Sequence, residues 1–197
     1  MKRFLTVCIL CAMPIFSHAA EYVIDTKGAH AFIQFRVKHL GFSWLYGRFN
    51  DFEGQFVFDQ NKPEKNRIEV QIDTASVDSN HTVRDKYLRG KDFLNVKAFP
   101  KASFVSTAYE KQGDAAALLK GDLTLHGQTH PVTIDIEHIG GGKDPWGGYR
   151  EGFEGRTTIK PEVWGIPMID KLGAASAEVE LILTVEGVRK KKKKHKK

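Results

Sequence analysis

Apolar and polar residues alternate at every second position along most of this chain. Ile33, Phe35 and Val37 alternate with Gln34 and Arg36, and the same period recurs in 52–58 and 67–73. A period of two places the apolar set on one face of a β-strand and the polar set on the other. Further runs of this kind span residues 21–25, 103–110, 118–125, 132–139, 152–160 and 177–186. The pattern therefore predicts an all-β fold of about eight strands.

Turn residues between these runs favour antiparallel neighbours. His126-Gly127-Gln128-Thr129 lies between two strand runs, as a hairpin turn would. Asn61–Pro63 and Gln112–Asp114 break other runs, and Gly140–Pro145 is expected to form a longer loop. Alternation and spacing fit a closed barrel or a two-sheet sandwich equally well, so they do not choose between these two folds.

The first nineteen residues have the pattern of a cleaved secretory signal peptide. Lys2 and Arg3 precede an almost wholly apolar stretch from Phe4 to Phe16, and Ser17-His18-Ala19 supplies a cleavage site near Ala19/Ala20. The apolar stretch is shorter than the roughly 20 residues that a spanning helix needs. Residues 1–19 are therefore predicted to direct export, with the periplasm as the expected location.

Both cysteines of the chain, Cys8 and Cys11, lie inside this signal peptide. The mature chain is therefore expected to contain no disulfide, no thiolate metal site and no cysteine nucleophile. A domain without disulfides behind a positively charged signal fits the periplasm of a Gram-negative bacterium.

Positive charge is concentrated at the C-terminus. The run 189–197 holds 8 of the 30 Lys and Arg residues and the first three residues hold 2, which leaves 20 basic against 24 acidic residues in the body. We expect one domain over 20–188 and a disordered tail over 189–197, because blocks of like charge repel one another. The tail could make weak contact with an anionic membrane. Nucleic-acid binding is not expected, since the body has no basic and aromatic stripe.

Motifs for catalysis and for cofactor binding are missing from the sequence. It has no Gly-x-Ser-x-Gly elbow, no His-Glu-x-x-His, no phosphate loop and no dinucleotide fingerprint. His81 and Asp85 would share one face of a helix, but catalytic zinc needs a third protein ligand and no spacing supplies one. We expect no metal and no cofactor.

A polar segment from Asp73 to Phe104 interrupts the strand pattern. Asn80 is a suitable helix N-cap and Gly90 a suitable stop, so a short helical insertion is expected near residues 80–97. The helix is either a solvated surface element or a lid whose His81, Arg84 or Arg89 meets a ligand headgroup.

Several short motifs, in order, resemble the YceI family of secreted lipid-binding proteins. The first are Val37-Lys38-His39-Leu40-Gly41, Ser76-Val77-Asp78 with Asn80-His81 and Arg84-Asp85, and Asp92-Phe93-Leu94 with Phe99-Pro100. Gly121-Asp122-Leu123-Thr124-Leu125 and Asp144-Pro145-Trp146-Gly147 follow. The resemblance runs from about Tyr22 to Val188, and the lysine tail is foreign to it.

This resemblance implies an extended, eight-stranded antiparallel, lipocalin-like barrel whose interior holds a long isoprenoid or a similar amphiphilic lipid. It implies a periplasmic carrier, reservoir or scavenger rather than an enzyme. The alternative is a lipid-modifying or isomerising enzyme on the same barrel that uses His81 and Asp85. A third hypothesis is an interaction protein that forms a homodimer and senses stress.

Two sets of ligand-contacting residues follow from strand parity and from the resemblance. The expected cavity lining is Ile33, Phe35, Val37, Phe56, Phe58, Val70, Ile72, Leu123, Ile134, Phe153, Leu181 and Leu183. The expected contacts at the mouth are His39, Trp44, His81, Arg84, Asp85, Trp146 and Trp164. We also expect the aromatic stretch 40–46 to lie around the mouth, and Trp146 and Trp164 to lie in loops.

Overall fold

The computed structural model describes residues 19–191. The predicted signal peptide, except Ala19, and the tail from residue 192 lie outside these residues. Between residues 19 and 191, no helix has the length and apolar character needed to cross a membrane.

Strands make up most of the described chain, with short helical segments between them. The strands are β1 (Ala20–Ile24), β2 (Phe32–His39), β3 (Ser43–Phe49), β4 (Phe52–Phe58), β5 (Arg67–Asp73), β6 (Val77–Asp78), β7 (Lys101–Lys111), β8 (Ala116–Leu125), β9 (Gln128–Lys143), β10 (Tyr149–Ile159) and β11 (Val179–Arg189). The helices are α1 (Thr82–Leu88) and α2 (Met168–Leu172), and the 3-10 turns are η1 (Pro63–Lys65), η2 (Thr74–Ser76), η3 (Pro161–Trp164) and η4 (Ala174–Ser176).

Eight of the strands close into an antiparallel barrel. The ring runs β1-β4-β5-β7-β8-β9-β10-β11 and returns to β1 through pairs such as Val23 with Val188. This closure confirms the predicted all-β, eight-stranded, lipocalin-like barrel and excludes a two-sheet sandwich. A closed ring leaves no free edge in this part of the sheet.

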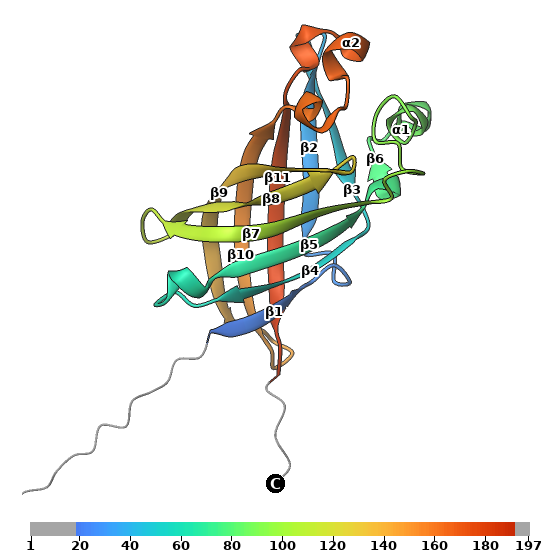
Figure 1. Cartoon of the computed structure of the whole chain (residues 1–197). Helices are drawn as coiled ribbons and strands as arrows, with labels where there is room; N and C mark the ends of the chain where they lie inside the picture. The colour runs from blue at the N-terminus through green and yellow to red at the C-terminus, as the bar shows by residue number, and fades with distance from the viewer. Residues whose placement is uncertain (1–18, 192–197) are drawn as a thin grey trace, which may run out of the picture.

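The upper part of the barrel is built from a second tier of strands (Figure 1). β11 pairs with β1 near its C-terminal end and with β2 over Val179–Thr184, so β1 and β2 occupy successive stretches of the same edge. β3 continues the sheet beyond β2, and β6 pairs with β3. Residues 25–31, 50–51 and 74–76 interrupt the strands. These interruptions let β2, β3 and β6 bend away from the ring, which extends the barrel upward.

The turn between β8 and β9 is the predicted hairpin. Leu125 pairs with Gln128, and the two residues between them, His126 and Gly127, both have positive φ (49° and 75°). Such a two-residue turn matches the natural twist of an antiparallel pair. A Cβ atom on residue 127 would lie 2.5 Å from the Phe99 ring, so only glycine fits here.

One strand was not predicted, and one predicted loop was wrong. Ser43–Phe49 forms β3, because every residue of it pairs across to β2. Leu40, Leu45 and Tyr46 of the aromatic stretch 40–46 still line the cavity under α1 and α2, as expected for the mouth. Gly140–Lys143, expected as loop, belongs to β9 and pairs with β10 up to Tyr149. Backbone pairing with a neighbouring strand overrides the weak intrinsic β-propensity of glycine there.

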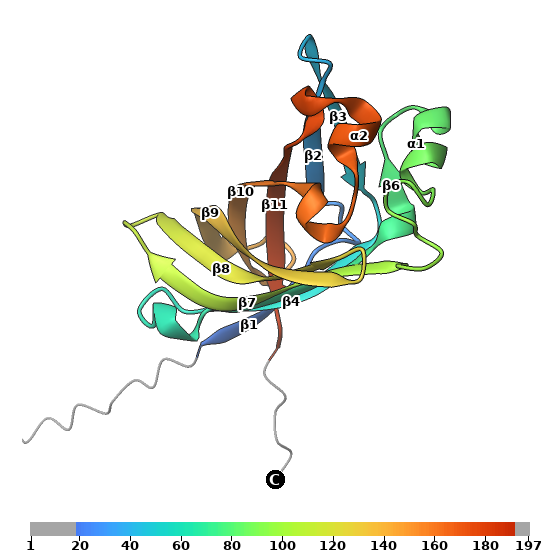
Figure 2. The same ribbon diagram turned by 45° about the horizontal axis from the view of Figure 1, so that its top comes forward.

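The polar segment contains the expected short helix, α1, followed by turns up to Phe99. Its N-cap is His81 rather than Asn80, because His81 is extended and its Nδ1 accepts the backbone N–H of Arg84. Asn80 instead adopts positive φ (59°) and donates its N–H to Asp78. α1 and α2 both lie at the upper end of the molecule (Figures 1 and 2).

The C-terminal end of the fold runs slightly into the predicted tail. Arg189 is the last residue of β11 and pairs with Tyr22. The Lys190 N–H donates to the carbonyl of Glu21. Residues 189 and 190 are therefore part of the sheet rather than of a free tail.

Candidate ligand-binding cavity

The interior of the barrel contains two adjoining apolar cavities. The lower chamber, inside the ring, has a volume of about 140 Å³, and the upper chamber, under α1 and α2, of about 940 Å³. Ile33, Ile72, Leu123 and Leu181 line both chambers, so these share one apolar wall. The upper volume lies within the range of about 300–1,000 Å³ typical of small-molecule sites.

The wall of β11 shows how far this apolar surface extends. Val179 lines the upper chamber, Leu181 lines both, and Leu183 and Val185 line the lower chamber. Each strand residue advances the chain by about 3.3 Å, so these four residues cover a strip of roughly 20 Å. The interior is therefore long and narrow rather than round.

All twelve residues expected to line the cavity face one of the chambers. Phe56, Phe58, Val70, Ile134, Phe153 and Leu183 line the lower chamber, Phe35 and Val37 line the upper one, and Ile33, Ile72, Leu123 and Leu181 line both. The parity of the alternation placed them correctly because side chains of a strand point to opposite faces in turn. Their contact with a ligand stays a prediction.

The Phe35 ring is held against the wall of the upper chamber. Phe35 pairs across the sheet with Gly47, and a Cβ atom on residue 47 would lie 2.2 Å from this ring. Glycine at position 47 thus makes room for the ring to lie flat on the neighbouring strand. The chamber keeps its width as a result.

The polar residues expected at the mouth fall into two groups. His39, His81 and Arg84 line the upper chamber. Asp85 does not, because its carboxylate is buried and accepts hydrogen bonds from the backbone N–H and the Oγ of Ser79. The Arg84 guanidinium also donates to Ser79, at its Oγ and its carbonyl, so Arg84 and Asp85 both hold the start of α1 in place.

None of the three tryptophans lines a chamber. Trp44 lies beside Arg36, whose guanidinium carbon is 4.3 Å from its ring centre. Trp164, expected in an exposed loop, is only 3 % exposed, and its Nε1 donates to the Leu123 carbonyl at 3.0 Å. η3, which Pro161 begins and Gly165 ends at φ 73°, turns this ring inward. Trp164 therefore fastens the upper cover to the barrel wall.

Trp146 lies at the opposite end of the barrel from the upper chamber. It is 75 % exposed in the turn between β9 and β10, and its ring lies over the Arg150 guanidinium at 5.2 Å. Glu186, which belongs to the same network as Arg150, is seven positions along β11 from Val179 at the upper chamber. The expectation that Trp146 lies at the mouth was wrong.

No pattern in the sequence indicated part of the upper wall. Phe93, Leu94, Ile166 and Met168 contact the upper chamber from segments outside the strands. Phe93 and Leu94 belong to a motif of the resemblance, but no period links them to the strand residues. Only the folding of the two covers over the barrel brings them to the cavity.

The polar pair His138 and Glu151 lies where the apolar surface of the lower chamber ends. His138 Nε2 lies 2.7 Å from a buried Glu151 carboxylate oxygen, and the His138 ring is about 5 Å from Phe58 and Phe153 of the chamber wall. Burial, with the nearby Glu151 carboxylate, raises the pKa of Tyr22 to about 12. The apolar surface thus ends at a polar floor.

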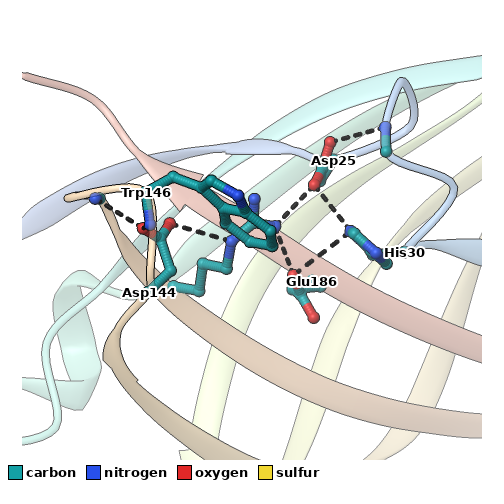
Figure 3. A network of polar contacts seen from close by, with 8 residues as sticks. Asp25, His30, Asp144, Trp146 and Glu186 are labelled. Carbon is teal, nitrogen blue, oxygen red and sulfur yellow. Dashed lines mark hydrogen bonds and ion pairs between the residues drawn. The ribbon is translucent and has the colours of Figure 1, made fainter.

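On the outer face of the sheet at this end of the barrel, Arg150 joins three carboxylates from distant parts of the chain (Figure 3). Its guanidinium donates to Asp25 at 2.6 Å, to Asp144 at 3.1 Å and to Glu186. His30 Nδ1 lies 3.0 Å from the Asp25 carboxylate. These residues tie β10, β11, the β9–β10 turn and the segment after β1 together at the lower end.

Two of these carboxylates and His30 could also be considered as metal ligands. Ligand atoms of Asp25, His30 and Glu186 lie within 4.8 Å of one another, and among residues 19–191 this is the one such group. The Arg150 guanidinium already donates to both carboxylates and neutralises charge between them. The geometry therefore supports a structural ion network here.

The Arg150 network predicts a loss of stability in acid. The hydrogen bond from Arg150, followed by that from His30, lowers the pKa of Asp25 from 3.8 to about 2. A carboxyl whose pKa is lower in the folded chain stabilises the fold above its unfolded pKa, and this contribution is lost as the pH falls from about 4 through about 2. The urea midpoint should fall over this window, and Arg150→Met should lower it at pH 7 and flatten its pH dependence.

Arg156→Met is the matched control for this experiment. Arg156 also pairs with carboxylates, but its side chain is half exposed and its partners lie on the barrel surface. Exposed ion pairs contribute little to stability. Equal midpoints and equal pH profiles for the two variants would show that the network contributes no more than a surface pair.

The geometry defines a closed antiparallel barrel with an elongated apolar interior, which is the lipocalin-like class of small-molecule-binding architectures. The model of the YceI-like domain matches residues 22–187, and the chain belongs to the YceI family. A UPF0312 protein of Pseudomonas aeruginosa (strain LESB58) is 58 % identical over 171 residues, covering 87 % of this chain and 88 % of the relative.

Two solved structures share the fold. The crystal structure of Burkholderia cenocepacia BcnA matches with a TM-score of 0.74 at 24 % identity, over 83 % of this chain and 98 % of that one. A polyisoprenoid binding domain from Saccharophagus degradans matches with a TM-score of 0.61 at 14 % identity, over 88 % of this chain and all of that one. At these identities the likeness concerns the fold alone.

Proposed function

We propose that this protein is a periplasmic carrier, reservoir or scavenger that holds a long isoprenoid, such as a polyprenyl chain or an isoprenoid quinone, or a similar lipid. The observation that carries this proposal is the shared apolar wall of the two chambers, about 20 Å long on β11 alone. A chain buried there gains about 25 cal/mol per Å² of apolar surface removed from water. That gain needs no specific polar contact.

The orientation of the lipid follows from the position of the polar groups. His39, His81 and Arg84 line the upper chamber, whereas the lower chamber has a wall dominated by apolar side chains. The headgroup should therefore remain in the upper chamber while the tail passes Leu123 into the lower one. The polyisoprenoid binding of the Saccharophagus degradans domain, which has the same fold, supports a ligand of this class.

The enzyme hypothesis had rested on His81 and Asp85. In the structure, His81 Nδ1 caps α1 and the Asp85 carboxylate is bonded to Ser79, so both atoms have structural partners within the chain. A proton-transfer pair needs hydrogen-bond reach between its members or through one water. The geometry favours binding over chemistry at this pair.

Native mass spectrometry of the protein purified from the periplasm without refolding tests this proposal. We expect a population heavier than the polypeptide by one lipid mass, and solvent extraction should release that lipid. After detergent stripping, the protein should take up an added polyprenyl alcohol. Repeated native preparations that are empty and that take up no added isoprenoid would overturn the proposal.

A further inference from the structure

We propose that the rim of the upper chamber docks onto a phospholipid bilayer that carries anionic headgroups, with the turn between β2 and β3 entering the interface. We define the rim as Leu40, Phe42, Val83, Tyr87, Ile169 and Leu172. The biological purpose assigned to this docking, lipid exchange, rests on the proposed function. The surface itself is argued independently from exposure, position and charge.

Three separate elements contribute exposed apolar side chains to the rim. Leu40 and Phe42 come from the β2–β3 turn, Val83 and Tyr87 from α1, and Ile169 and Leu172 from α2, and they are 37 to 86 % exposed. Single exposed apolar residues are normal on a soluble protein. Six of them from three elements at one end form a patch of the kind that marks an interaction surface.

The rim is continuous with the cavity. Leu40, Val83, Tyr87 and Leu172 contact the upper chamber as well as solvent. An apolar chain leaving a bilayer could therefore pass from the membrane to the chamber without exposing its apolar surface to water, which is unfavourable. This continuity favours a lipid surface as the occupant.

The β2–β3 turn is built to present its apolar residues outward. Leu40 and Gly41 have positive φ (52° and 82°), and the Phe42 N–H donates to the His39 carbonyl at 2.9 Å. The turn projects beyond α2 at the upper end of the molecule (Figure 2). Phe42, which is 86 % exposed, is thereby placed at the tip.

Charge around the rim is complementary to an anionic headgroup layer. An exposed lysine lies in or beside each of the three elements: Lys38 at the end of β2, just before the turn, Lys86 in α1 and Lys171 in α2. Asp92 lies 3.3 Å from Lys171, and Asp170 is also exposed there, so the positive excess is modest. Apolar side chains with nearby lysines are the pattern of interfacial membrane binding.

Quenching of tryptophan fluorescence can locate the docking face. Trp44 follows the tip by two residues, Trp146 lies at the opposite end, and Trp164 is buried. The full chain is mixed with vesicles of phosphatidylcholine and phosphatidylglycerol (3:1) in which the phosphatidylcholine is brominated. We expect quenching that Trp44→Phe removes and Trp146→Phe leaves in place. Quenching that depends on Trp146 instead would overturn the proposal.

A paired substitution measures the contribution of the tip. Leu40→Ser with Phe42→Ser should lower vesicle partitioning by about tenfold or more, because two large apolar side chains no longer enter the interface. The control is Ile139→Ser, an exposed residue of β9 outside the rim. Every variant keeps the C-terminal basic run, and a repeat at high salt suppresses electrostatic binding through it. A second pair, Val83→Ser with Tyr87→Ser on α1, tests the rim independently if the first pair proves to fold poorly.

The outcomes separate this inference from the proposed function. Rim variants that lose vesicle binding but keep an unchanged melting curve support docking, whether or not the protein carries lipid. Protein that takes up isoprenoid from detergent while all variants partition equally overturns docking and leaves the proposed function standing. A rim variant that turns a dimer into a monomer without changing vesicle binding assigns the rim to self-association and also overturns docking.

Discussion

Replacement of Ala102 by phenylalanine is expected to weaken the binding of a long isoprenoid by about 50-fold. Ala102 lines the upper chamber and packs against Ile33 and Ile72, which line both chambers, so a larger side chain there narrows the passage between them. Excluding roughly three methylene groups from burial costs about 2.4 kcal/mol, which is about 50-fold in affinity. Titration of the stripped protein with polyprenyl alcohols of increasing length checks this value.

The control for this substitution is Val105→Phe on the same strand. Val105 is exposed on the outer face of β7, so the added ring should leave binding unchanged. Short-chain alcohols, which fit in the upper chamber alone, should lose much less affinity to Ala102→Phe than long ones. An equal loss at all chain lengths would mean that the two chambers do not act as one site.

Replacement of Trp164 by alanine should lower the free energy of unfolding by about 3–5 kcal/mol, the usual cost of removing a buried aromatic side chain. Trp164 is almost fully buried, donates to the Leu123 carbonyl and packs edge-on against His130, with ring centres 5.2 Å apart. Its removal leaves a void between the barrel wall and the cover of the upper chamber. Urea denaturation at neutral pH measures the loss.

Trp146→Ala provides the comparison. Trp146 is exposed and contacts mainly the Arg150 guanidinium, so its removal should cost no more than about 1 kcal/mol. Similar losses for the two variants would contradict the role of Trp164 as the anchor of the cover. A Trp164→Ala protein that remains folded should also release its lipid more readily.

The strands of the lower barrel were predictable because a strand buries one face. The alternation in 67–73 and 177–186 identified β5, β11 and their inward residues, and the hairpin at His126–Gly127 followed from local turn chemistry. Strand β3 was missed as a strand because its apolar side chains include exposed ones, Trp44 and Tyr46, which obscure the period. Periodicity reports burial, so it fails where apolar residues face solvent.

The candidate site was predictable only in part, because periodicity describes each strand separately and not how distant segments meet. The inward parity of Ile33, Phe56 and Leu183 is a property of each strand alone, whereas the positions of Trp146 and Trp164 depend on which end of the barrel a loop reaches. The ion pairs of Arg150 with Asp25 and Glu186 join residues 125 and 36 positions apart in the chain. No spacing in the sequence predicts such a contact.

The strand period, the polarity of each strand face and, through the order of the motifs, the resemblance to one family could all be read from the residues alone. These are local properties, because they depend on the side chains of one segment and on the alternation of a pleated strand. Closure of the ring, the adjoining chambers and the apolar rim could not be read in this way and became visible only in the folded chain. They arise where segments distant in the chain meet, since a cavity is the space that several packed elements leave between them.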